Sequence, residues 1–136
     1  MEITRSSVET GRGPAEWFSG AVFIDTIAVA EARRPLGAAV VHFTPGARTA
    51  WHTHPLGQTI WVIQGVGLCQ REGGQVELIR PGDAVFFEPG EKHWHGATAT
   101  RLMTHVAIHQ ADESGSTVTW GEHVTDEEYG RGEVGA

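Results

Sequence analysis

The chain has 136 residues, of which 40% are hydrophobic and 20% are charged, and these proportions are typical of one globular domain with its own core. Its formal net charge of −7 argues against a nucleic-acid partner, because phosphate binding favours a basic surface. No apolar run approaches the roughly 20 residues of a membrane span, so we expect no membrane partner. The lone Cys69 cannot form an internal disulfide, and the N-terminus lacks the apolar region of a signal peptide, so we expect a cytoplasmic location.

The elements predicted along the chain are short β-strands separated by glycine and proline turns. A polar N-terminal arm at residues 1–15 precedes them. The predicted strands span residues 17–29, 37–43, 58–64, 66–71, 75–80, 84–87, 93–97, 101–109 and, as a short piece, 117–120. Short strands with such turns are typical of an all-β sandwich or barrel. We therefore predict one barrel domain over residues 16–125 and a flexible C-terminal tail over residues 126–136.

A histidine-rich stretch follows the second predicted strand. His52 and His54 are two residues apart, so on an extended strand both imidazoles point to the same side. After a short loop, Gln58 can bring its amide oxygen to the same point, and His93 supplies a third imidazole from downstream. Three imidazoles and one oxygen suit a first-row divalent metal, although these ligands alone do not choose among Mn, Fe, Co, Ni and Zn. The pattern thus predicts a metal site.

The spacing around these residues resembles the two-part signature of the cupin superfamily. Residues 46–65 match the pattern Gly-x5-His-x-His-x3-Glu-x6-Gly, except that Gln58 stands in the place of the glutamate. Residues 82–97 match the spacing of Gly-x5-Pro-x-Gly-x2-His-x3-Asn, with Glu88 and Ala97 at the proline and asparagine positions. Of these three departures, only Gln58 concerns the metal. The resemblance implies an all-β cupin jelly-roll barrel (a double-stranded β-helix) in a single domain.

A closer resemblance reaches over most of the chain. Residues 47–59, 89–97, 103–105 and 122–127 are similar to small bacterial cupins that include manganese-dependent (R)-selective hydroxynitrile lyases. This likeness implies one divalent ion per chain, with Mn as the leading candidate and Fe, Zn, Co or Ni as alternatives. It also implies cleavage and formation of aromatic (R)-cyanohydrins, such as mandelonitrile from benzaldehyde and cyanide. The alternatives are a cupin dioxygenase and a metal-dependent small-molecule binding protein without turnover.

Three further histidines are candidate catalytic residues: His95, His105 and His109. His95 shares strand parity with His93 and should face the same cavity. His105 and His109 lie four residues apart on the last long strand, so their side chains point to the same face. Alternation alone would bury the opposite, more apolar face of that strand. Only the resemblance favours an inward His105. An unliganded histidine near a dication should stay neutral at pH 7 and serve as a base.

The remaining expectations concern the substrate and the assembly. The candidate walls of an apolar substrate pocket are Ala39, Val41, Phe43, Ile60 and Val62. If Gln58 faces the metal, Trp61 and Ile63 lie on the outer face of the same strand. We predict a small-molecule substrate and a homodimer, or a homotetramer built from dimers, that uses this outer face. Alternatively, the strand around Phe23 and Ile24 could cover that face within one chain.

Overall fold

The computed structural model describes residues 1–5 and 9–132, and its regular structure there is almost entirely β-strand. One sheet has six strands in the order β1-β3-β4-β12-β7-β10. The bounds of these strands are β1 Gly11–Arg12, β3 Val22–Ala28, β4 Leu36–Phe43, β12 Met103–Gln110, β7 Gln58–Gly65 and β10 Ala84–Phe87. Neighbouring strands in this sheet are antiparallel.

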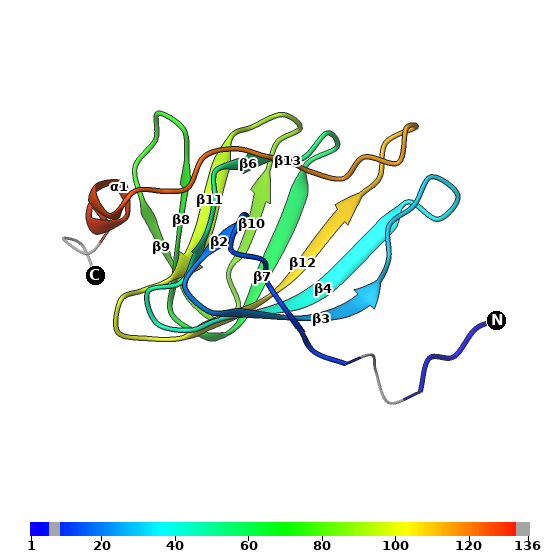
Figure 1. Cartoon of the computed structure of the whole chain (residues 1–136), viewed down its shortest axis with the longest axis horizontal. Coiled ribbons are helices and arrows are strands. Elements are labelled where there is room, and N and C mark those ends of the chain that lie inside the picture. The colour runs from blue at the N-terminus through cyan, green and yellow to red at the C-terminus, as the bar shows by residue number, and fades with distance from the viewer. Residues whose placement is uncertain (6–8, 133–136) are drawn as a thin grey trace.

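The second sheet has seven strands and lies opposite the first (Figure 1). Its main path runs β13-β6-β11-β5-β2, and β8 pairs with both β11 and β9. The bounds are β2 Phe18–Ser19, β5 Arg48–Thr49, β6 His52–Thr53, β8 Gly67–Arg71, β9 Glu77–Ile79, β11 His93–Ala97 and β13 Thr119–Trp120. Two curved antiparallel sheets that enclose one core confirm the predicted all-β jelly-roll barrel.

The main core lies between the two sheets. Phe43, Ile60, Val62 and Met103 are at most 1% exposed there. Strand β7 shows the expected period of two, because Gln58, Ile60 and Val62 are buried while alternate residues are more exposed. The inner surface of the six-stranded sheet therefore supplies both the apolar core and, at the start of β7, a polar amide.

The N-terminal region is more structured than its polar composition predicts. Residues 11–12, within the predicted arm, form β1 and pair with β3. The strand predicted over residues 17–29 is divided into β2 and β3 by a turn at Gly20, whose φ is +81°. A Cβ at Gly20 would lie 2.9 Å from the Cβ of Ala47, so this turn requires glycine for space as well as for conformation.

The C-terminal segment corrects a second expectation. Instead of a flexible tail from residue 126, the chain forms the helix α1 at Asp126–Gly130, while residues 133–136 lie outside the described part. A capping box between Thr125 and Glu128 begins the helix, and the Tyr129 hydroxyl donates to the carbonyl of Ala97 at 2.6 Å. The helix lies beside β8 and β9 (Figure 1). No helix of the described residues is long and apolar enough to cross a membrane.

Beneath α1 is a second, smaller apolar cluster on the outer face of the seven-stranded sheet: Trp51, Leu68, Trp94, Val124 and Tyr129. Trp94 lies between His93 and His95 on β11 and is fully buried under this cover. Because side chains alternate along a strand, an outward Trp94 fixes both neighbouring imidazoles toward the barrel interior. The helix thus helps to position the histidines of β11 from the opposite side of the sheet.

Candidate metal centre

The barrel interior contains a cluster of imidazoles contributed by β6, β11 and the segment after β6. Ring nitrogens of His52, His93 and His95 lie within 4.8 Å of one another, and all three residues are buried. His52 and His93 are direct partners in the pairing of β6 with β11. The ring of His54 lies 5.0 Å from that of His52, and Gln58 Oε1 lies 3.3 Å from His93 Nε2. The structure therefore brings the four residues predicted to hold a metal into one cluster, with His95 beside them.

A backbone carbonyl orients each of the three imidazoles predicted as metal ligands. The Nδ1 contacts are 2.9 Å from His52 to Ala50 O, 2.7 Å from His54 to Thr117 O, and 2.7 Å from His93 to Glu91 O. A carbonyl oxygen only accepts hydrogen bonds, so each neutral ring carries its proton on Nδ1 and has its lone pair on Nε2. This is the arrangement that orients a histidine and prepares it to bind a metal through Nε2.

Burial keeps these imidazoles uncharged at neutral pH. Desolvation lowers the pKa of His54 and of His93 to about 4. For His52, desolvation and the nearby imidazoles of His93 and His54 hold the pKa well below its ordinary value. Neutral imidazoles are the form that binds metals, so the cluster needs no deprotonation at pH 7.

Several ring nitrogens in the cluster have no hydrogen-bonding partner in the described structure. His54 Nε2 and His95 Nε2 are buried and make no hydrogen bond to any described residue. His93 Nε2 and Gln58 Oε1 face each other at 3.3 Å, although both are acceptors once His93 carries its proton on Nδ1. A cation would satisfy His54 Nε2, His93 Nε2 and Gln58 Oε1 at once. The nitrogen and oxygen donors, their burial and their neutrality therefore fit a divalent transition-metal ion.

A second pair of histidines lies deeper in the barrel. His105 Nε2 is 3.0 Å from His95 Nδ1, and His105 has no exposed surface. His105, Ala107 and His109 are on the inner face of β12, whereas Val106 and Ile108 are on the outer face, so alternation by apolar character gives the wrong face for this strand. Burial lowers the pKa of His105 to about 3 and also lowers that of His109. All three candidate catalytic histidines thus line the interior in neutral form.

Five histidines line a cavity of about 160 Å³ (His52, His54, His95, His105 and His109), whereas His93 is not part of its wall. Its other walls are mostly apolar, and they include three of the five predicted pocket residues: Ala39, Val41 and Phe43. Ile60 and Val62 are inward, as predicted, but they do not line the cavity, because other core side chains cover them completely.

Sequence reasoning missed five apolar or aromatic residues of the cavity wall: Phe18, Ile24, Ala107, Val118 and Trp120. Phe18 and Trp120 belong to the two-residue strands β2 and β13, and β13 is adjacent to His52 only because it pairs with β6. Such a pairing between distant segments leaves no spacing signal in the sequence. The aromatic character of Trp120 within a predicted short strand is the one available hint.

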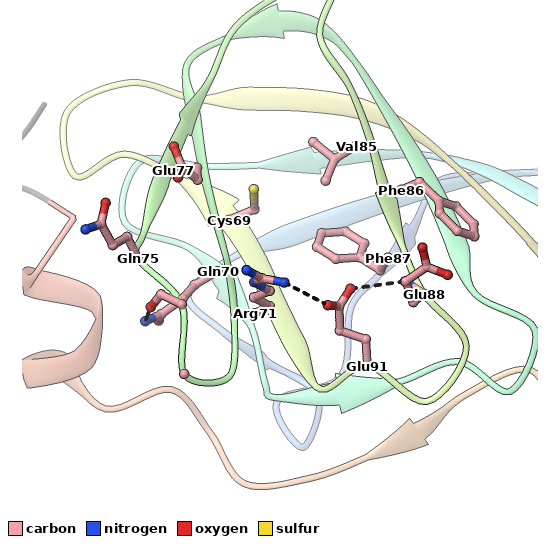
Figure 2. Close-up of a pocket in the computed structure, with 12 residues that line it drawn as sticks. Cys69, Gln70, Arg71, Gln75, Glu77, Val85, Phe86, Phe87, Glu88 and Glu91 are labelled. Atoms are coloured by element: carbon pink, nitrogen blue, oxygen red, sulfur yellow. Dashed lines mark hydrogen bonds and ion pairs between the residues drawn. The ribbon is translucent and has the colours of Figure 1, made fainter.

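A larger cavity of about 580 Å³ opens between β8, β9 and β10. Figure 2 shows Cys69, Val85 and Phe87 around it, with Glu91 in contact with Arg71 and with the backbone of Glu88. The ring centroids of Phe87 and His93 lie 3.7 Å apart in a stacked arrangement, so Phe87 separates this cavity from the imidazole cluster. Burial raises the pKa of Cys69 to about 12, which keeps this thiol protonated. Because this cavity is lined by no imidazole, the smaller one is the candidate site.

Comparisons with known proteins agree with this architecture. The profile of the cupin domain family matches residues 39–109. A curated relative from Granulicella tundricola, named (R)-mandelonitrile lyase, is 58% identical over 132 residues, which cover 96% of this chain and 100% of the relative.

Solved structures show the same similarity. A cupin-like protein from Thermotoga maritima has 33% identity and a TM-score of 0.82, with 92% of this chain and 95% of that chain covered. A predicted oxalate decarboxylase from Thermotoga maritima has 22% identity and a TM-score of 0.67, with 79% of this chain and 96% of that chain covered, and it shows the shared fold. By the extent of these matches, the chain belongs to the cupin family.

Proposed function

We propose that this protein is a metal-dependent hydroxynitrile lyase that cleaves and forms aromatic (R)-cyanohydrins, with mandelonitrile, benzaldehyde and hydrogen cyanide as the reference compounds. The observation that carries the proposal is the full-length similarity, at 58% identity, to the protein named (R)-mandelonitrile lyase. The cavity supports it, because neutral imidazoles and apolar residues line it together. An apolar cavity of roughly 150 Å³ can hold benzene, so about 160 Å³ suits a monocyclic aromatic compound.

We propose that His52, His54, Gln58 and His93 hold one divalent ion per chain, with Mn as the leading candidate and Fe, Zn, Co or Ni as alternatives. When bound, the ion supplies a Lewis acid that lowers the pKa of a neighbouring hydroxyl group and stabilises developing negative charge. Three neutral imidazoles and a neutral amide cancel none of its positive charge. A glutamate at the position of Gln58 would cancel one unit, so Gln58 favours anionic ligands such as cyanide.

We assign proton transfer to His105, with His95 and His109 as the other candidates. In cyanohydrin cleavage the hydroxyl proton leaves the oxygen, the C–C bond breaks, the carbonyl forms, and the departing cyanide takes up a proton. The low pKa of His105 means that its free-base form is present at neutral pH. Its Nε2 contact with His95 Nδ1 offers a path for the proton within the cavity, and the apolar walls at Ala39 and Val41 exclude water from the aryl ring.

The decisive experiment measures metal content and cyanide release from mandelonitrile on the same purified protein. His105→Ala should keep its metal and lose roughly 10²–10⁴-fold in activity. His42→Gln is the matched control, because His42 lies on the other face of the six-stranded sheet, where it contacts Asp25 and Thr104. A fully active, metal-loaded His105→Ala would move proton transfer to His95 or His109.

The same preparations distinguish the alternative functions. Oxygen consumption without cyanide release would indicate a cupin dioxygenase with a redox-active metal. Tight binding of a small molecule with neither reaction would indicate a binding protein. Absence of cyanide release from the metal-loaded protein would overturn the lyase proposal.

We also propose that the chain self-associates as a homodimer, or as a tetramer of dimers, through the outer face of the six-stranded sheet. Four large apolar residues are exposed there: Trp61 at 49%, Ile63 at 42%, Phe86 at 53% and Ile108 at 37%. Phe86 and Ile108 both pair with Thr59 from opposite sides of β7, so the patch is continuous over β10, β7 and β12. The strand containing Phe23 and Ile24 pairs with β4 and leaves this patch uncovered. Such an apolar area favours a protein partner.

We further propose a cytoplasmic location and a small-molecule substrate without a nucleic-acid or membrane partner. The free, buried thiol of Cys69 supports a reducing compartment, where thiols remain unpaired. The small volume of the histidine-lined cavity supports a low-molecular-weight ligand.

A further inference from the structure

The ring of Phe87 lies between the larger cavity and the imidazole of His93. The two ring centroids are 3.7 Å apart and the interplanar angle is 9°, so Phe87 covers one face of the imidazole almost in parallel. Phe87 also lines the cavity of about 580 Å³ between β8, β9 and β10 (Figure 2). Only 3% of Phe87 is exposed, and His93 has no exposed surface. One aromatic side chain therefore separates a proposed metal ligand from this cavity.

His93 is enclosed on its other sides as well. The ring of His52 lies 4.2 Å away at an angle of 54°. The Nδ1–H of His93 donates to the carbonyl of Glu91 at 2.7 Å, and its Nε2 lies 3.3 Å from Gln58 Oε1. The smaller cavity is lined by His52, His54 and Gln58 but not by His93. Of the four proposed ligands, His93 is thus the one that is absent from the wall of that cavity.

Phe87 also neighbours the ligand that faces His93. Phe87 and Gln58 are direct partners in the antiparallel pairing of β10 with β7, and both side chains are buried. Directly opposed residues of two antiparallel strands have Cβ atoms about 4.5–5.5 Å apart. Phe87 is therefore adjacent to the ligand from the six-stranded sheet and stacks on the ligand from the seven-stranded sheet.

This enclosure restricts the motion of the His93 imidazole. The ring lies between those of Phe87 and His52, so it cannot tilt out of its plane without displacing one of them. A metal ion leaves a site of several ligands by losing them one after another, and a packed ligand can detach only after a local opening. Groups that orient a metal-binding histidine also change the metal affinity. The side chain that holds His93 should therefore affect both the affinity and the rate of metal loss.

We propose that Phe87 is a positioning residue of the metal centre, whose ring holds the imidazole of His93 in place, closes the centre toward the larger cavity and so slows the loss of bound metal. The inference rests on the proposed function, because His93 must be one of the metal ligands. Phe87 does not line the smaller cavity, so it acts through His93 and not through contact with the substrate.

The test uses cobalt-loaded protein, because the absorption bands of Co²⁺ report both its ligand geometry and its removal. The protein is mixed with an excess of a strong chelator, and the fading of the bands gives the rate of metal loss. Phe87→Ala should lose metal at least about tenfold faster than the wild type, because a permanent gap replaces a local opening of the core. Its affinity for Co²⁺ should fall about two- to tenfold with the loss of the aromatic pair. A wild-type rate of metal loss in Phe87→Ala would overturn the proposal.

Val85→Ala is the matched control. Val85 lies two residues before Phe87 on β10, lines the same cavity and packs against the same core, but it pairs with Ile60 instead of Gln58. This variant also loses apolar atoms between the larger cavity and the core, while the cover of His93 stays in place. It should lose metal at nearly the wild-type rate. Equal acceleration in Val85→Ala and Phe87→Ala would assign the effect to loosened packing and overturn the proposal.

The absorption spectrum separates positioning from stability. Lower stability alone leaves the spectrum of the folded, loaded protein unchanged, whereas an imidazole that is free to tilt changes the ligand geometry and shifts the bands. Phe87→Ala should therefore shift the bands, and Val85→Ala should not. Phe87→Leu keeps most of the buried volume and thus the fold, but leucine cannot stack on the imidazole, so this variant should shift the bands as well. An unchanged spectrum in Phe87→Leu would overturn the proposal.

The outcomes separate this inference from the proposed function. Faster metal loss and shifted bands in Phe87→Ala, without cyanide release by the wild type, would support the role of Phe87 and refute the lyase. Cyanide release by the wild type, with a wild-type rate of metal loss in Phe87→Ala, would support the lyase and refute the role of Phe87. Full metal occupancy in His93→Ala would refute the assigned ligands and the inference together.

Discussion

The burial of the histidine cluster predicts that the metal-free protein is unusually sensitive to mild acid. His54 and His93 have pKa values of about 4 and His105 of about 3, all below the ordinary histidine value of 6.5. The unfolded chain therefore binds more protons than the folded chain between those values and pH 6.5. These histidines contribute stability above pH 6.5, and that contribution is lost as the pH falls toward 4.

The size of the effect follows from these three residues. Each histidine that is protonated only in the unfolded state changes the free energy of unfolding by about 1.4 kcal/mol per pH unit. Between pH 7.5 and pH 5, each contributes a loss of about 2 kcal/mol, and the three together about 6 kcal/mol. Typical domains have only about 5–15 kcal/mol of stability, so this loss is a large fraction of the total, and the metal-free protein should unfold at a much lower urea concentration at pH 5 than at pH 7.5.

The assay is urea unfolding followed by tryptophan fluorescence at several pH values, with and without added metal. Because metal binding and protonation compete for the same nitrogens, saturating metal should move the loss of stability to lower pH. His105→Gln removes one titrating group and should reduce the slope by about 1.4 kcal/mol per pH unit. A free energy of unfolding that stays constant from pH 7.5 to pH 5 without metal would refute the reasoning, as would an unchanged slope in His105→Gln.

Three further predictions concern the metal ligands and the assembly. The double variant His52→Ala/His54→Ala should lose nearly all bound metal in elemental analysis, and full occupancy would contradict the assigned ligands. Gln58→Glu should still bind metal, but in titrations it should bind cyanide at least about tenfold more weakly, because the glutamate cancels one positive charge of the metal. Equal cyanide affinity in the wild type and in Gln58→Glu would exclude this charge argument. Trp61→Glu should shift the protein toward monomer in light scattering. Val29→Glu, in the exposed loop after β3, is the control and should not change the oligomeric state. A wild-type protein that is monomeric at micromolar concentration would exclude the interface.

The sequence could predict those parts of the imidazole cluster that come from residues close together in the chain. His52 and His54 lie two residues apart, and the turn that follows delivers Gln58 to the start of β7. A period of two on extended chain is a steric property of the backbone, so it predicts shared direction without knowledge of the fold. His93 was named as a third imidazole from downstream, but local spacing could not place it beside His52, because β11 meets β6 only in the folded barrel.

The sequence contains a helix-start motif at the C-terminal segment that the prediction of a flexible tail overlooked. Thr125 and Glu128 have the spacing of a capping box, and the helix that they begin places Tyr129 in the apolar cluster over Trp94. Arg48 also holds this segment, through a hydrogen bond to the Val124 carbonyl and a contact with the Tyr129 ring. Polar composition alone predicted a flexible tail, because composition does not register two or three anchoring side chains.

Strand β12 shows where prediction from side-chain alternation is limited. Its inner face carries His105, Ala107 and His109, while the more apolar Val106 and Ile108 face outward. Alternation shows which residues share a face, but it cannot say which face is buried when apolar residues lie outside and neutral histidines lie inside. The inner face carries histidines that line the cavity, and the outer face carries the apolar residues of the proposed partner surface. Local patterning therefore failed on the strand that carries both the proposed base and part of the proposed interface, as expected where function departs from the rules of simple packing.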